Sequence, residues 1–91
     1  MIVARRFVVT GRVQAVGFRY FVYEAALREN LSGWVRNRPD RSVEAQVEGE
    51  QEAVTRFERA IRQGPPHARV DQVETDVVDP TGRAIGFSIQ G

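Results

Sequence analysis

The chain has 91 residues and a formal net charge of +1, from thirteen basic and twelve acidic residues, and 42% of its residues are hydrophobic. This length suits one small domain over residues 1–91, and the apolar content excludes wholesale disorder. Because the charges nearly balance, the chain lacks the basic excess of a general nucleic-acid binder. The absence of cysteine excludes disulfides, thiolate catalysis and thiolate metal sites.

The sequence carries no signal for a membrane or for secretion. No apolar run approaches the roughly 18 residues of a membrane span. The first residues lack the long apolar segment and the small-residue cleavage pattern of a secretory signal. We therefore expect a cytoplasmic protein with no membrane partner. A monomer is expected at this size, although an exposed edge strand can support a dimer.

The N-terminal third predicts a strand followed by a helix. Residues 2–10 are rich in β-branched and aromatic side chains and stop at Gly11, which is typical of a largely buried strand. From Phe18 the apolar residues recur at the spacing of one helix face. This pattern predicts an amphipathic helix that ends near Asn30.

A β-hairpin is predicted next. Residues 32–38 form its first strand, and the Pro-Asp-Arg segment at 39–41 forms its turn. From 43 to 48, valine and alanine alternate with glutamate and glutamine, the pattern of a strand with one wet face. The first strand does not show whether Asn37 faces the core or the solvent, because apolar residues occur on both of its faces.

The C-terminal half predicts a second helix and two further strands. Residues 50–63 carry acidic side chains in the first turn and apolar residues on one face, and the following Gly-Pro-Pro stops the helix. Residues 70–78 alternate imperfectly, which predicts a strand bulged around Asp71 and Gln72. After a further turn, residues 85–89 predict a short final strand.

This order of elements is β, α, β, β, α, β with one added terminal strand. It predicts an α+β, ferredoxin-like βαββαβ sandwich, with one antiparallel sheet, two helices on one of its faces and a short extra C-terminal strand. Ferredoxin-like domains serve as enzymes, RNA binders, metal carriers and small-molecule sensors. The function therefore depends on individual residues rather than on the fold.

The stretch GRVQAVGFR, residues 11–19, lies between the first strand and the first helix. The free N–H groups of a helix N-terminus and the positive end of its dipole favour an anion at this position. Six successive backbone N–H groups can form a phosphate-binding nest: those of Gln14, Ala15, Val16, Gly17, Phe18 and Arg19. Arg19 can add a bidentate clamp on phosphate oxygens. Spacing alone slightly favours the alternative, a tight strand-to-helix connection with a solvated Arg19.

Two segments together resemble one protein family. GRVQAVGFR resembles the signature of the acylphosphatase family, and GWVRNRPDRSVEAQVEG, residues 33–49, resembles the strand-turn-strand segment of the same family. The segments occur in the expected order and separation. The similarity continues through the second helix and GPPHARVDQVE to the terminal GFSI, so it covers essentially the whole chain.

The resemblance implies an enzyme that hydrolyses the carboxyl-phosphate bond of small acyl phosphates to a carboxylate and inorganic phosphate. It implies that Arg19 and the backbone of loop 14–19 bind the phosphoryl group, and that Asn37 orients the attacking water. An asparagine amide cannot act as a general base, but it can hold a water molecule. A carboxylate leaving group needs little protonation, so positioning and electrostatic stabilisation suffice. We expect no cofactor and no metal.

Two positions depart from the family pattern, in which glycine is common at both. Ala15 keeps its backbone N–H, but a positive φ there would cost roughly 1 kcal/mol or more. If φ is negative, alanine can instead stiffen the loop. Arg41 replaces a turn glycine and can alter the hairpin beside Asn37. Neither change removes a proposed catalytic side chain.

Two other functions remain open. One is a non-catalytic ferredoxin-like module that binds phosphate or another anion without turnover. The other is an RNA-binding domain. The near-neutral charge and the lack of the aromatic pattern of RNA-binding sheets weaken this hypothesis, so no nucleic-acid partner is expected.

The remaining polar residues that could belong to a site have ordinary structural explanations. His67 is expected in a surface loop. Asp40 and Asp71 are expected to form local hydrogen bonds or to be solvated. Three arginines could attract anionic substrates, but we favour solvated positions at the sheet edge for them: Arg12, Arg36 and Arg38.

Overall fold

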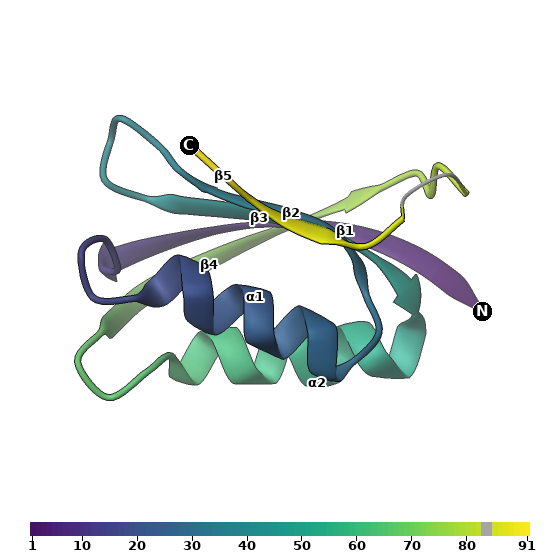
Figure 1. The fold of residues 1–91 in the computed structure, drawn as a ribbon, viewed down its shortest axis with the longest axis horizontal. Coiled ribbons are helices and arrows are strands. Elements are labelled where there is room, and N and C mark those ends of the chain that lie inside the picture. The colour runs from purple at the N-terminus through teal and green to yellow at the C-terminus, as the bar shows by residue number, and fades with distance from the viewer. Residues whose placement is uncertain (83–84) are drawn as a thin grey trace.

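The structure is a computed structural model that describes residues 1–82 and 85–91. Two helices lie side by side beneath one face of a five-stranded sheet, and neither helix covers the other face (Figure 1). The elements in chain order are β1 (Ile2–Arg12), α1 (Phe18–Arg28), β2 (Ser32–Asn37), β3 (Val43–Glu50), α2 (Gln51–Gln63), β4 (Arg69–Val78) and β5 (Phe87–Gln90). This confirms the ferredoxin-like α+β fold with an extra C-terminal strand. Neither of the two helices in this described part is long and apolar enough to cross a membrane.

The order of the strands across the sheet is β4-β1-β3-β2-β5. The first four strands pair antiparallel, as predicted, but β5 pairs in parallel with β2, so the prediction of a wholly antiparallel sheet is wrong for this strand. The reason is the path of the chain. Val78 at the end of β4, Glu48 in β3 and Ser32 at the start of β2 belong to one row across the sheet. After β4 the chain passes Glu48 of this row, to which Thr81 and Gly82 donate hydrogen bonds, and β5 starts beside the start of β2 and runs in the same direction.

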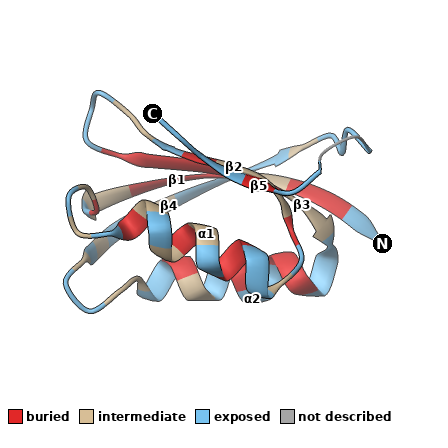
Figure 2. Ribbon diagram, viewed as in Figure 1, coloured by how far each residue is buried: buried red, intermediate tan, exposed pale blue. Residues whose placement is uncertain are grey.

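The core lies between the sheet and the helices, where the buried positions of both layers face each other (Figure 2). Phe7 of β1 and Phe57 of α2 are fully buried, and their ring centroids are 5.7 Å apart. In β2 the buried residue is Val35, so its alternate neighbours Gly33 and Asn37 lie on the helix-facing side of the sheet. The tertiary structure thus decides the face of Asn37, which the sequence left open.

The predicted bulge lies in β4, opposite the C-terminal end of β1. Thr10 pairs with Gln72 and Gly11 pairs with Val70, so Asp71 is the extra residue of β4. Gly11 has a φ of 126°, and a Cβ at this position would lie 2.1 Å from the carbonyl oxygen of Arg69. Only glycine therefore fits here. The ladder shifts at the point where β1 gives way to the loop before α1.

Candidate active site

The loop after β1 and the hairpin between β2 and β3 are joined by one side chain. The Nε2 atom of Gln14 donates hydrogen bonds to the carbonyl oxygens of Arg38, at 2.9 Å, and Ser42, at 3.0 Å. The phosphate-loop candidate is thereby attached to the hairpin that carries Asn37. From the sequence, only the backbone N–H of Gln14 was predicted to have a role, in binding phosphate. It contained no signal for this contact, because the hairpin lies well beyond the local pattern.

A hollow of about 200 Å³ opens beside this junction. Arg19 from the first turn of α1 and Asn37 from the last residue of β2 both line it. Among residues 1–82 and 85–91 the lining is Val13, Ala15, Gly17, Phe18, Arg19, Tyr20, Asn37 and Ile89. The structure therefore brings together the two side chains that the sequence singled out. Of the proposed loop residues, Gln14 and Val16 are not part of this lining, and Val16 packs against the core instead.

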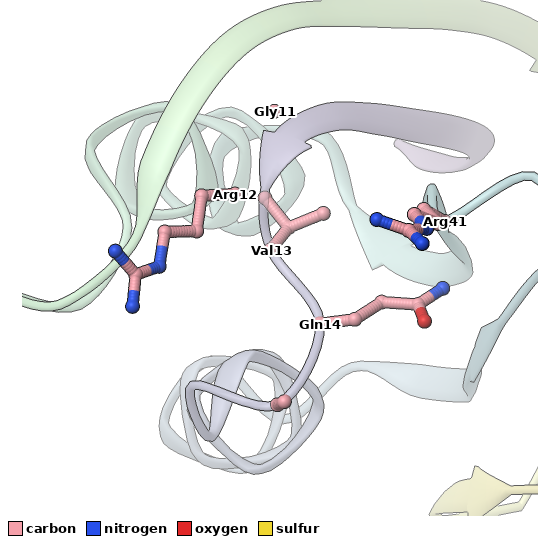
Figure 3. A pocket seen from close by; sticks show the side chains of 6 residues that line it. Gly11, Arg12, Val13, Gln14 and Arg41 are labelled. Carbon is pink, nitrogen blue, oxygen red and sulfur yellow. The ribbon is translucent and has the colours of Figure 1, made fainter.

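A second hollow, of about 300 Å³, is lined by Gly11, Arg12, Val13, Gln14, Ala15 and Arg41. Figure 3 shows Gln14 extending towards Arg41, whereas Arg12 extends away from both. This hollow contains neither Arg19 nor Asn37. The smaller hollow is the better candidate because it adds the N-terminus of α1 and the Asn37 amide to a guanidinium group, whereas the Gln14 amide of the larger hollow is already bound to the hairpin.

The N-terminus of α1 is open to an anion. Gly17 caps the helix with φ 74° and ψ 19°, makes no side-chain capping bond, and is followed by no acidic residue in the first turn. The first helical N–H to find a carbonyl partner is that of Phe21, which donates to Gly17. The preceding amides lack partners within the helix, and the helix dipole favours negative charge beside them. A Cβ on Gly17 would meet nothing within 4 Å, so the positive φ and not crowding explains the glycine.

The Arg19 guanidinium is positioned by the edge strand β5, against which α1 packs. Its Nη1 atom donates a hydrogen bond of 2.9 Å to the carbonyl oxygen of Gln90, at the end of β5. This is the one hydrogen bond of that side chain within residues 1–82 and 85–91, and a guanidinium has five N–H donors. The C-terminal strand thus orients Arg19 and leaves donors for an anion in the hollow.

Asn37 carries a buried polar atom without a partner. Its Oδ1 atom has no hydrogen bond to any residue in the described ranges, although the residue as a whole is half-buried. Leaving such an atom unpaired costs about 1–3 kcal/mol, so most buried polar atoms are paired. A half-turn of the amide exchanges its acceptor and its donors. The protein therefore does not commit this amide to a structural bond, and it can bind a molecule in the hollow.

Both departures from the family pattern have left-handed backbones. The φ angle is 61° at Ala15 and 74° at Arg41. The sequence left the sign of φ at Ala15 open, and the structure shows the strained alternative. Arg41 places the same strain in the hairpin turn next to Asn37.

The hairpin turn is held by a local carboxylate. The backbone N–H of Ser42 donates to Asp40 Oδ1 at 3.0 Å, and the Ser42 hydroxyl donates to the same atom. These bonds, the hydroxyl bond first, hold the pKa of Asp40 below its usual value. The expected local role of Asp40 is confirmed. Asp71 likewise bonds locally, to Arg69 at 2.9 Å, and His67 is exposed in the loop before β4.

The sheet face away from the helices holds an ion-pair ladder that the sequence did not predict. Glu44 was placed on the wet face of β3, but it is only 4% exposed because Arg6 and Arg36 cover it. Burial alone would raise the pKa of Glu44, but hydrogen bonds from the two arginines outweigh it and hold the pKa below the usual value. Arg36 also lies over the Trp34 ring, 5.2 Å from its centroid. Arg36 is thus bound to Glu44 rather than directed at the candidate site, and the favoured solvated role was incomplete.

Comparison with known proteins identifies the family. The family model described as Acylphosphatase matches residues 5–89, almost the whole chain. The chain belongs to the acylphosphatase family. It is 50% identical over 88 residues to an acylphosphatase of Anaeromyxobacter dehalogenans, an alignment that covers 97% of this chain and 95% of the relative. It is also 48% identical over 82 residues to one of Bacillus licheniformis, covering 90% and 88% of the two chains.

Solved structures of the family share the fold. The crystal structure of the acylphosphatase from Bacillus subtilis matches with a TM-score of 0.94 and 38% identity over 100% of both chains. The family expected from the two sequence segments is therefore confirmed, and so is the enzyme class. The chain is an acyl phosphate hydrolase, and a binding module without turnover is not favoured.

Proposed function

We propose that Arg19 and the backbone N–H groups of loop 14–19 hold the phosphoryl group of a small acyl phosphate, and that Asn37 orients the water that attacks its phosphorus. One observation carries this assignment. Arg19 and Asn37 come from different elements but line the same hollow, and the buried Asn37 Oδ1 has no partner in the described part of the chain. A guanidinium for the phosphoryl oxygens and an uncommitted amide for water are the two groups that the reaction needs.

The reaction can proceed without a strong acid or base. The water oxygen forms a bond to phosphorus as the bond between phosphorus and the acyl oxygen breaks, and the carboxylate leaves with the electron pair. A proton of the water passes to a phosphoryl oxygen of the substrate. Charge on the phosphoryl oxygens is met by Arg19 and by the amides at the start of α1. The protein thus contributes position and electrostatic stabilisation, and no cofactor enters the scheme.

We further propose that residues 1–91 act as one domain and as a monomer, in the cytoplasm. The monomer rests on the size of the chain, which suits one small domain. We also propose that nucleic acid is not a partner. The net charge of +1 lacks the basic excess of a nucleic-acid binder, and two arginines of the uncovered sheet face are paired with carboxylates, Arg6 with Glu44 and Asp76 and Arg36 with Glu44.

The test is hydrolysis of benzoyl phosphate by the purified chain and by Arg19→Ala and Asn37→Ala. Arg12→Ala is the matched control, because Arg12 is an exposed arginine next to the same loop but lines only the other hollow. We expect turnover by the unmodified chain, a large loss in both site variants and a rate within about twofold in the control, as for a surface substitution. Full rates in both site variants would refute the residue assignment. Folded chain that binds phosphate without turnover would instead support the binding module.

A further inference from the structure

We propose that Tyr20 and Ile89 form a subsite for the acyl group, which makes the enzyme prefer acyl phosphates with an aromatic or large apolar acyl group. The inference rests on the proposed function, because a phosphoryl group held at Arg19 is what brings the acyl group to these side chains. Nothing in the phosphate cradle itself distinguishes one acyl group from another.

The two side chains present exposed apolar surface at the candidate site. Tyr20 is 58% exposed and Ile89 is 41% exposed, and both line the hollow that contains Arg19 and Asn37. The other large apolar residues of the lining, Val13 and Phe18, are each 1% exposed and belong to the core. Tyr20 and Ile89 therefore do not serve the core in the same way. They leave apolar area uncovered where a substrate would lie.

Tyr20 and Ile89 are each adjacent in the sequence to a residue that positions the Arg19 guanidinium or carries it. Tyr20 follows Arg19 in the first turn of α1, and Ile89 precedes Gln90, whose carbonyl oxygen accepts the hydrogen bond from Arg19. The apolar pair thus belongs to the same two elements that position the phosphate-binding group. The hollow has about 200 Å³, below the roughly 300–1,000 Å³ of sites for drug-sized ligands. A phosphoryl group inside it leaves the acyl group at the mouth, next to Tyr20 and Ile89.

The Tyr20 ring is supported by a neighbouring ring. It stacks on Tyr23 with centroids 5.9 Å apart and an interplanar angle of 26°. Tyr23 in turn lies against Phe87 of β5, with centroids 6.2 Å apart. Phe87 is 8% exposed, and it lies on the same face of β5 as Ile89. A ring held in this way loses little side-chain freedom when an acyl group packs on it, which favours binding.

The apolar surface of Tyr20 and Ile89 favours an aromatic acyl group over a small one. A phenyl ring of a benzoyl group can pack on the Tyr20 ring and against the Ile89 side chain, whereas an acetyl group offers only a methyl group. Aromatic pairs contribute about 0.5–1.5 kcal/mol beyond buried area, which corresponds to roughly a 2- to 12-fold preference. The expected effect is therefore on discrimination between acyl groups, not on phosphate recognition.

The test compares kcat/KM for benzoyl phosphate and acetyl phosphate in the full chain and in Tyr20→Ala, Ile89→Ala and Tyr20→Phe. Leu27→Ala is the control, since Leu27 is a 48% exposed apolar residue of α1 outside the hollow. We expect Tyr20→Ala to lower the ratio of the two kcat/KM values by about 3- to 10-fold. Ile89→Ala should lower it less, while Tyr20→Phe and Leu27→Ala should leave it unchanged. Equal losses for both substrates in Tyr20→Ala would overturn the subsite, because they would show an effect on the phosphate site.

A binding measurement separates this inference from the reaction itself. Benzoylphosphonate and acetylphosphonate carry the same two acyl groups on a phosphorus bonded directly to carbon, and calorimetry gives their affinities without turnover. A preference for benzoylphosphonate that is lost in Tyr20→Ala supports the subsite even if the chain hydrolyses neither acyl phosphate, a result that would refute only the proposed function. Equal affinities of the unmodified chain for the two phosphonates would overturn the subsite.

Discussion

Replacing Ala15 with glycine should stabilise the fold. The φ of Ala15 is 61°, in the left-handed region where a residue with a Cβ costs roughly 1–2 kcal/mol. Glycine removes this cost, but its greater freedom in the unfolded chain offsets about 0.4–1 kcal/mol of the gain. At the midpoints of these two ranges, the expected net increase in the free energy of unfolding is about 0.8 kcal/mol. For a domain of this size, this corresponds to a rise in Tm of roughly 2–8 °C.

Thermal unfolding followed by circular dichroism, with denaturant unfolding beside it, measures this change. Ala60→Gly is the matched control, because Ala60 lies inside α2 and is not among the residues with positive φ. Glycine in a helix interior should destabilise by about 1 kcal/mol. Opposite signs for the two substitutions would support the reasoning. A Tm lowered by Ala15→Gly as it is by Ala60→Gly would refute it, because the left-handed backbone would then carry no strain.

Three further predictions follow from the same region and from the open face of the sheet. Arg41→Gly should raise the free energy of unfolding by about 0.5–1 kcal/mol, since Arg41 has a φ of 74°; an unchanged denaturation midpoint would contradict this. Gln14→Ala should destabilise by about 1–3 kcal/mol and lower turnover, because two hydrogen bonds of about 0.5–1.5 kcal/mol each are lost, although both hairpin carbonyl oxygens keep a backbone donor; full activity would show that the loop needs no attachment. Glu44→Gln should destabilise by about 1–2 kcal/mol near neutral pH, less than a fully buried pair, since Arg6 and Arg36 are partly exposed. The folded-state pKa of Glu44 lies below its usual 4.5, so the carboxylate stabilises the fold above that pH, and denaturation curves of variant and unmodified chain should converge as pH falls below it.

The local elements of the fold were predictable because each has its own periodicity. The alternation over residues 43–48 and the apolar face of the second helix both correspond to observed elements, β3 and α2. The irregular alternation after Val70 correctly indicated the bulge at Asp71. The parallel pairing of β5 was not predictable in the same way. It depends on where β4 ends relative to β2, which no local pattern describes.

The candidate site could be predicted in its residues but not in its assembly. Arg19 and Asn37 were named from the resemblance, and the structure places both at one hollow. The side-chain bonds of Gln14 and the support of Arg19 by Gln90 join segments that are distant in the sequence. Such contacts depend on tertiary packing, so a single sequence does not reveal them. The same holds for the presence of Tyr20 and Ile89 in the lining of one hollow.

The burial of Glu44 shows a different limit. Alternation placed it correctly on the face away from the helices, where a carboxylate is normally solvated. Two arginines from neighbouring strands cover it instead. A period-two pattern gives the side of the sheet, but it does not say what the neighbouring strands place beside the residue.

The most direct test of the account separates phosphate binding from water positioning. The affinity for inorganic phosphate and the kcat for benzoyl phosphate are measured in Arg19→Ala and Asn37→Ala. We predict that Arg19→Ala weakens phosphate binding by roughly 10- to 150-fold, as expected for the loss of charge-assisted hydrogen bonds. Asn37→Ala should lower kcat by on the order of 100-fold, with phosphate affinity close to that of the unmodified chain. Equal losses of phosphate affinity in the two variants would contradict the separate roles of the guanidinium and the amide.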